Sequence, residues 1–172
     1  MEEILLFKKS FFKTKISNFH LIETVRSFIE ENKEKFTERS WDCNNNTSLK
    51  KFINILYEVE EFKYITANIE KEIKSLIKQP FMIIESWINI LNKNGYQEFH
   101  KHERKGEKEG SGILYLTKEN SQIEFAYFPE DITLKIKPEQ GDILLFDSDL
   151  YHRVVDSKQE RISLAFNFKR QD

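Results

Sequence analysis

The sequence predicts an α+β fold, in which helices of an N-terminal part, residues 1–80, pack on a C-terminal β core, residues 81–172. Before residue 80, apolar residues recur every three or four positions, as in amphipathic helices. After residue 80 the period falls to two, and short β-branched and aromatic segments alternate with turn residues. We interpret the 172 residues as one domain, because a chain of this length commonly forms a single core.

Two helices are expected in the N-terminal part. Residues 18–36, "NFHLIETVRSFIEENKEKF", carry five apolar side chains on one face: Leu21, Ile22, Val25, Phe28 and Ile29. A longer helix is expected over residues 47–79, with Thr47 or Ser48 as its N-cap and the Gln79-Pro80 pair at its end. The polar segment between them, residues 38–48, is expected to be a loop.

The C-terminal part contains a series of short strand candidates. Residues 81–102 alternate in places around a turn at Asn94-Gly95. Five further segments have the composition of strands: 111–117, 122–128, 132–138, 141–147 and 160–169. Strands at this spacing are typical of a β-sandwich or a small barrel.

Charge and composition restrict the partners and the compartment. With 27 basic and 29 acidic residues, the chain offers no excess charge for nucleic acid or an anionic membrane. No apolar run approaches the roughly 20 residues of a membrane span, and the acidic start "MEEILLFKKS" is unlike a signal peptide. Cys43 is the single cysteine, which fits a cytoplasmic protein. The oligomeric state stays open, a homodimer included.

His100 and His102 are the first candidate metal ligands. Residues i and i+2 of a strand point to the same face, so both imidazoles would project together. The alternative is that both rings are solvent-exposed or engaged in local hydrogen bonds. His152 follows fifty residues later, at the start of another predicted strand. It would complete a facial set of three ligands, or it would be a structural histidine at a strand end.

Arg161 is a candidate anion-binding residue. Alternation places Arg161, Ser163 and Ala165 on one face of the last strand. A buried guanidinium needs a partner, and its fork matches a carboxylate. The carboxylate would come from a ligand or from the chain itself, as Glu124 or Asp142. The alternative is an exposed arginine on an edge strand.

These residues belong to a series of short motifs with a resemblance to a known family. The C-terminal half resembles the iron(II)- and 2-oxoglutarate-dependent oxygenases, and especially small, largely uncharacterised members from bacteria and phages. The motifs are Trp87 to Asn89, Gly95-Tyr96, His100 to His102, Ser111 to Tyr115, Pro138 to Asp142, His152, and Arg161 to Asn167. Their order and spacing are more specific than any one of them.

The resemblance implies a double-stranded β-helix, a jelly-roll or cupin-like core, with Fe(II), 2-oxoglutarate and O2 as cofactor and co-substrates. His100, His102 and His152 would be the catalytic metal ligands. Arg161 would bind the distal carboxylate of 2-oxoglutarate, assisted by Ser163 and Tyr115. The implied reaction hydroxylates an unidentified small-molecule or peptide substrate and releases succinate and CO2.

One position departs from the wider superfamily. The second ligand there is usually Asp or Glu, whereas this chain has His102. Glu98 and Glu103 are the alternative carboxylates. With three histidines, metal binding is expected to weaken as the pH falls through about 6.5.

Two rival functions remain open. A cupin-type dioxygenase would use a three-histidine metal without 2-oxoglutarate, but such an enzyme has no need of the Arg161 strand. A β-barrel binding module would hold a structural zinc, which requires a closed shell of four ligands.

Overall fold

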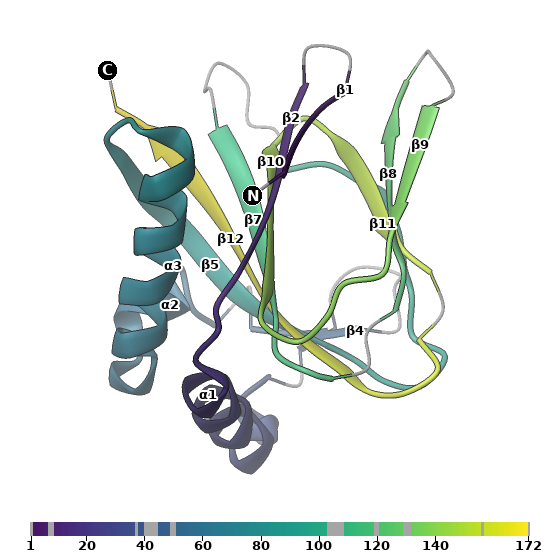
Figure 1. Cartoon of the computed structure of the whole chain (residues 1–172). Coiled ribbons are helices and arrows are strands. Elements are labelled where there is room, and N and C mark those ends of the chain that lie inside the picture. The colour runs from purple at the N-terminus through teal and green to yellow at the C-terminus, as the bar shows by residue number, and fades with distance from the viewer. Residues whose placement is uncertain are drawn as a thin grey trace.

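The structure is a computed structural model that describes residues 2–6, 9–36, 38–39, 45–48, 51–102, 109–118, 121–128, 132–155 and 157–171. Two antiparallel sheets face each other, and the helices cover the far side of the larger sheet (Figure 1). No helix of the described ranges is both long and apolar enough to cross a membrane.

The larger sheet has eight strands, in the spatial order β1 (Glu2–Leu6), β2 (Lys9–Lys15), β10 (Asp142–Asp147), β7 (Glu109–Tyr115), β12 (Arg161–Arg170), β5 (Phe81–Leu91), β4 (Asn45–Thr47) and β3 (Glu38–Arg39). The smaller sheet has four, in the order β6 (Gln97–His100), β11 (Tyr151–Val154), β8 (Ile123–Tyr127) and β9 (Ile132–Ile136). The helices are α1 (Phe19–Glu31), α2 (Ile55–Glu58) and α3 (Lys63–Ile77), with 3₁₀ turns η1 (Lys33–Phe36) and η2 (Glu60–Phe62).

Strand β12 divides two apolar cores by simple alternation. Ile162, Leu164 and Phe166 point outward into a core formed with the helices, where α1 and α3 contribute residues such as Ile22 and Ile69. Ala165 points the other way, into a second core that lies between the sheets and contains Phe125 and Phe146. Arg161 and Ser163 have the parity of Ala165, so their side chains enter the space between the sheets.

The turn before β10 brings two predicted motifs together. Gly141 adopts φ +86°, a conformation that glycine tolerates without strain. Its N–H donates to the carbonyl of Tyr115 over 2.8 Å, and Asp142 Oδ2 accepts from the Glu139 N–H over 2.8 Å. The turn thereby fixes Tyr115, at the end of β7, beside the start of β10.

The N-terminal part contains more strand than expected. Strand β2 pairs along β10, so the chain before α1 extends the larger sheet. The expected loop over residues 38–48 contains β3 and β4 among its described residues, and Cys43 lies outside them. Strands β3 and β4 have two and three residues, too few for a visible period of two, which explains why the pattern did not predict them.

The first predicted helix, over residues 18–36, agrees with α1 at its start, but α1 ends at Glu31 and the 3₁₀ turn η1 follows. The N-cap is Asn18, whose side chain accepts from the Leu21 N–H over 3.2 Å. The single helix over residues 47–79 is wrong. Thr47 belongs to β4, and Ser48 Oγ accepts from the Ile88 N–H over 2.9 Å, so the sheet edge takes the residues expected to cap a helix. The predicted end at Pro80 agrees with α3, which stops at Ile77.

Candidate metal centre and co-substrate site

Three histidines converge between the sheets. His152 on β11 lies directly opposite His100 at the end of β6. His102 follows two residues later, where its N–H donates to the Ser148 carbonyl over 2.8 Å. One ring nitrogen of each residue lies within 4.8 Å of the others, an arrangement that allows all three to bind one metal ion.

Hydrogen bonds to Nδ1 set the tautomer of two of these rings. His100 Nδ1 lies 2.7 Å from the Glu98 carbonyl oxygen, and His152 Nδ1 lies 3.1 Å from the Leu150 carbonyl oxygen. A carbonyl oxygen only accepts, so Nδ1 carries the proton in both rings. Nε2 is then the atom with the lone pair for a metal.

The tautomer of His102 is set by Asn167, a residue that the sequence motifs left without a predicted role. Asn167 Oδ1 lies 3.1 Å from His102 Nδ1 and also accepts from Ser111 Oγ over 2.6 Å. Asn167 Nδ2 donates to Glu85 Oε1 over 2.5 Å, which orients the amide with its oxygen toward the imidazole. Alternation was a signal for this residue, because Asn167 has the same parity as Arg161.

Burial keeps the three imidazoles neutral. Desolvation lowers the pKa of His100, lowers that of His102 to about 3, and lowers that of His152 well below its usual value. Repulsion between the rings adds to the shift of His102 and His152. Neutral rings are the form that binds metal, so the expected loss of binding near pH 6.5 moves to lower pH.

Aromatic side chains enclose the cluster. The Trp87 ring lies 5.2 Å from His102, and the rings of Phe146 and Phe125 lie 4.9 Å and 5.8 Å from His152. These contacts restrict the rotation of the imidazoles and keep water from their sides.

Arg161 is buried in the same space, and none of the carboxylates that the structure describes is paired with it. It is 2 % exposed, and its guanidinium carbon lies 4.9 Å from the centre of the Tyr115 ring. Nε and Nη1 have no hydrogen-bond partner among the residues that the structure describes, and the same holds for Tyr115 Oη. Desolvation raises the pKa of Tyr115 to about 12, so the phenol keeps its proton and remains a donor.

Neither predicted internal carboxylate neutralises Arg161. Glu124 pairs with Arg153 over 2.6 Å and with Lys135 over 3.1 Å. Asp142 pairs with Lys13 over 2.8 Å. A buried guanidinium with unpaired donors is costly unless an anion binds to it.

The predicted co-substrate residues are neighbours. Ser163 lies directly opposite Tyr115 across β12 and β7, two residues along β12 from Arg161. All three are buried. The donor set fits a carboxylate, and the three imidazole nitrogens fit a divalent transition metal, as the Fe(II) and 2-oxoglutarate expectation requires.

The two alternative carboxylate ligands, Glu98 and Glu103, are not among the clustered ligand atoms that the structure describes. The side chain of Glu98 is exposed and does not belong to the cluster of ligand atoms. Glu103 lies outside the described residues. The assignment of His100, His102 and His152 as ligands, and of Arg161, Ser163 and Tyr115 as co-substrate contacts, stays a prediction.

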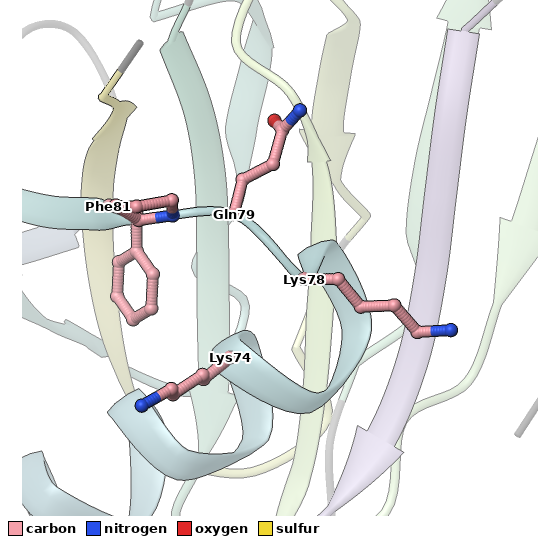
Figure 2. A pocket seen from close by; sticks show the side chains of 5 residues that line it. Lys74, Lys78, Gln79 and Phe81 are labelled. Carbon is pink, nitrogen blue, oxygen red and sulfur yellow. The ribbon is translucent and has the colours of Figure 1, made fainter.

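A pocket of about 420 Å³ lies away from this centre, at the end of α3 (Figure 2). Lys74, Lys78, Gln79, Pro80 and Phe81 line it. The amino groups of Lys74 and Lys78 point in opposite directions, so they do not converge on one anion (Figure 2).

Comparison with protein families gives one match. A family described as "Putative 2OG-Fe(II) oxygenase" matches residues 127–167, which span β9, β10, β11 and the first part of β12. These residues include His152 and Arg161. The predicted resemblance is confirmed over this segment. No curated protein sequence matches the chain.

Solved structures share the fold over nearly the whole chain. A prolyl-4-hydroxylase from Pseudomonas putida has a TM-score of 0.70 at 14 % identity, over 94 % of this chain and 93 % of that one. HygX from Streptomyces hygroscopicus, with nickel and 2-oxoglutarate bound, has 0.69 at 12 %, over 94 % and 83 %. SnoN, an α-ketoglutarate-dependent epimerase from nogalamycin biosynthesis, has 0.74 at 8 %, over 93 % and 76 %. The predicted double-stranded β-helix with helices packed on it is confirmed.

Proposed function

We infer that this protein, whose fold and C-terminal strands are similar to those of 2-oxoglutarate/Fe(II) oxygenases, is an Fe(II)- and 2-oxoglutarate-dependent oxygenase. The observation that carries this inference is the burial of the Arg161 guanidinium. Its Nε and Nη1 donors, which have no partner among the described residues, enter the space between the sheets, where the three histidines also converge. That pairing fits a co-substrate with a metal-chelating keto acid at one end and a carboxylate at the other.

His100, His102 and His152 hold the metal through neutral nitrogens, with Nδ1 of each ring hydrogen-bonded in the fold. Arg161 binds the distal carboxylate bidentately, and Ser163 and Tyr115 add hydroxyl donors. When bound, Fe(II) and 2-oxoglutarate supply the oxidative decarboxylation to succinate and CO2 that drives hydroxylation of the substrate.

The chain itself positions the groups and excludes water. Trp87 packs against the His102 ring, and Phe125 and Phe146 pack against the His152 ring, so these faces of the imidazoles are shielded from water. In this environment the interaction between Arg161 and a carboxylate is stronger than in water.

The prime substrate is a small molecule or a peptide in this proposal. The names of the structural neighbours cover both kinds, since one is a prolyl-4-hydroxylase and another is described with hygromycin B bound. We propose that the protein acts in the cytoplasm, without nucleic acid or membrane as a partner. Its net charge of −2 is consistent with that. A homodimer remains compatible with the proposal.

A cupin-type three-histidine dioxygenase that does not use 2-oxoglutarate is the second candidate. The exclusively imidazole ligand set favours it. The buried Arg161 argues against it, because such an enzyme leaves this guanidinium without a counter-ion.

Calorimetric titration of the Zn(II)-loaded protein with 2-oxoglutarate tests the proposal without turnover. Tight one-to-one binding that Arg161→Ala weakens supports the oxygenase. Metal binding without any binding of 2-oxoglutarate supports the cupin-type alternative. Arg153→Ala is the control, because Arg153 pairs with Glu124 and has a half-exposed side chain.

A further inference from the structure

Besides Arg161 and Tyr115, one more buried residue on the same inner face has a polar atom without a partner among the described residues. Asn45 on β4 is 2 % exposed, and its Nδ2 donates to Asn89 Oδ1 over 3.1 Å. Asn45 Oδ1 has no hydrogen-bond partner among the described residues. A buried carbonyl oxygen without a donor costs free energy, so this position is unexpected for a residue that serves the fold alone.

Strand register places the asparagine pair beside the co-substrate site. Asn89 on β5 lies directly opposite Ser163, and Asn45 lies opposite Leu91, which in turn lies opposite Arg161. Residues directly opposite in an antiparallel pair share a face. Both asparagines therefore face the space between the sheets.

The same strand connects this pair to the metal centre. Trp87 is two residues before Asn89 on β5 and has the same facing. Its ring contacts that of His102 at 5.2 Å. The pair is thus separated from the histidines by one aromatic side chain along the strand.

The unsatisfied groups at the co-substrate site and at the asparagine pair have opposite hydrogen-bonding character. Arg161 and Tyr115 present donors, which suit a carboxylate. Asn45 Oδ1 presents an acceptor. 2-Oxoglutarate carries acceptors alone when ionised, so it satisfies Arg161 and leaves Asn45 unsatisfied. A different ligand must supply the donor.

The asparagine pair has a definite complement. Because one amide of the pair donates to the other, Asn45 Oδ1 is left as an acceptor and the Asn89 NH2 as a donor. If both side-chain amides are flipped, the pair still presents one acceptor and one NH2. A carboxamide group also has one acceptor beside an N–H donor. The apolar neighbours Trp87 and Leu91 give no charge to bind an ionised group.

We propose that Asn45 and Asn89 form part of the prime-substrate site and bind a carboxamide group of the substrate, either a primary amide or a peptide bond. The proposal rests on the proposed function, because it assumes that the co-substrate occupies the Arg161 side. It narrows the substrate class to neutral amides.

The test uses nitrogen-15-labelled protein loaded with Zn(II) and 2-oxoglutarate. Acetamide, N-methylacetamide and acetone are titrated while the side-chain NH2 signals of Asn45 and Asn89 are followed by NMR. Acetone is the matched probe, because it keeps the acceptor and lacks the donor. Probes of this size bind weakly, in the millimolar range.

Saturable shifts of the two signals by an amide, with acetone at least about tenfold weaker, support the proposal. Asn45→Leu and Asn89→Leu are each expected to weaken amide binding about tenfold or more. Asn46→Leu, on the opposite face of β4, leaves it unchanged. N-methylacetamide binding as tightly as acetamide identifies a peptide bond, and a preference for acetamide identifies a primary amide.

Equal affinities for acetamide and acetone overturn the proposal, as does the absence of a saturable shift of either signal in the wild-type protein. The wild-type result needs no variant, so a variant that fails to fold does not obscure it. Calorimetry with 2-oxoglutarate on the same sample separates the two inferences. If the wild-type protein binds 2-oxoglutarate but no amide, the substrate site is refuted. If it does not bind 2-oxoglutarate, the proposed function is refuted.

Discussion

Replacement of Asn167 by leucine tests how the fold prepares His102 for a metal. Asn167 Oδ1 lies 3.1 Å from His102 Nδ1, and Asn167 is 1 % exposed. Removing the partner of a metal-bound imidazole typically costs ten- to a hundredfold in metal affinity. Ser111 Oγ, 3.2 Å from the same nitrogen, remains as a second acceptor. The expected loss is therefore near tenfold, or about 1.4 kcal/mol.

The same substitution also has a cost in stability. Asn167→Leu leaves the buried Ser111 hydroxyl without its acceptor and removes the donor to Glu85. An unmet buried polar group costs about 1–3 kcal/mol. Denaturant unfolding of the metal-free protein measures this contribution separately from metal affinity.

The assay is competition for Zn(II) against a chelator of known affinity at pH 7. Ser111→Ala keeps the Asn167 oxygen, so it is expected to lose less than about threefold in affinity. Asn68→Leu, the same change on the exposed face of α3, is the control. If a folded Asn167→Leu protein binds Zn(II) as tightly as the wild type, Asn167 does not prepare His102 for the metal.

Two further predictions concern the pH dependence of stability and the packing of the larger sheet. The buried histidines have lowered folded pKa values, so below about pH 6.5 the unfolded chain binds protons that the folded chain does not. The unfolding free energy of the metal-free protein should therefore fall with decreasing pH. The limiting slope is about 1.4 kcal/mol per pH unit for each ring that is protonated only in the unfolded chain. The slope should be shallower in His152→Leu, and equal slopes in the two proteins would contradict this. Gly112→Ala places a methyl group 2.2 Å from the Phe166 ring, so the variant should lose about 1–3 kcal/mol in denaturant unfolding, and wild-type stability would contradict this packing.

Periodicity predicted the elements whose two faces differ chemically. Along β12, the alternation of Arg161, Ser163 and Ala165 with apolar residues placed each side chain on the observed face. The helix α1 was predicted for the same reason, because its apolar stripe meets the sheet. In α1 one face contacts a core and the other faces solvent, and in β12 one face is apolar while the other carries Arg161 and Ser163. Both differences are visible in the sequence.

Contacts between distant segments were not predictable in this way. Strand β2 joins β10 across more than a hundred residues, and Thr47 pairs with Asn89 on β5. Local pattern says nothing about which strand edge is open to receive a short segment. For the same reason the Asn45–Asn89 pair could not be inferred, since Asn45 lies in a polar run typical of a loop.

The site was predicted in part. The convergence of the three histidines follows the predicted facing, although His102 lies beyond the end of β6 and is held by Ser148 instead of strand pairing. The hydrogen bonds of Asn167 to His102 and Ser111 depend on three separate segments, and no spacing within one segment contains that information.

In the proposed function, Arg161 binds the carboxylate of 2-oxoglutarate while the three histidines hold Fe(II). Anaerobic titration of the Fe(II)-loaded protein with 2-oxoglutarate, followed by the visible charge-transfer band of the chelate, tests it most directly. The wild type and the Arg153→Ala control should give the same saturating band, and Arg161→Ala should weaken 2-oxoglutarate by about 30-fold or more, since truncating a buried charge partner costs at least about 2 kcal/mol. A folded Arg161→Ala protein that binds 2-oxoglutarate as tightly as the wild type would contradict the account.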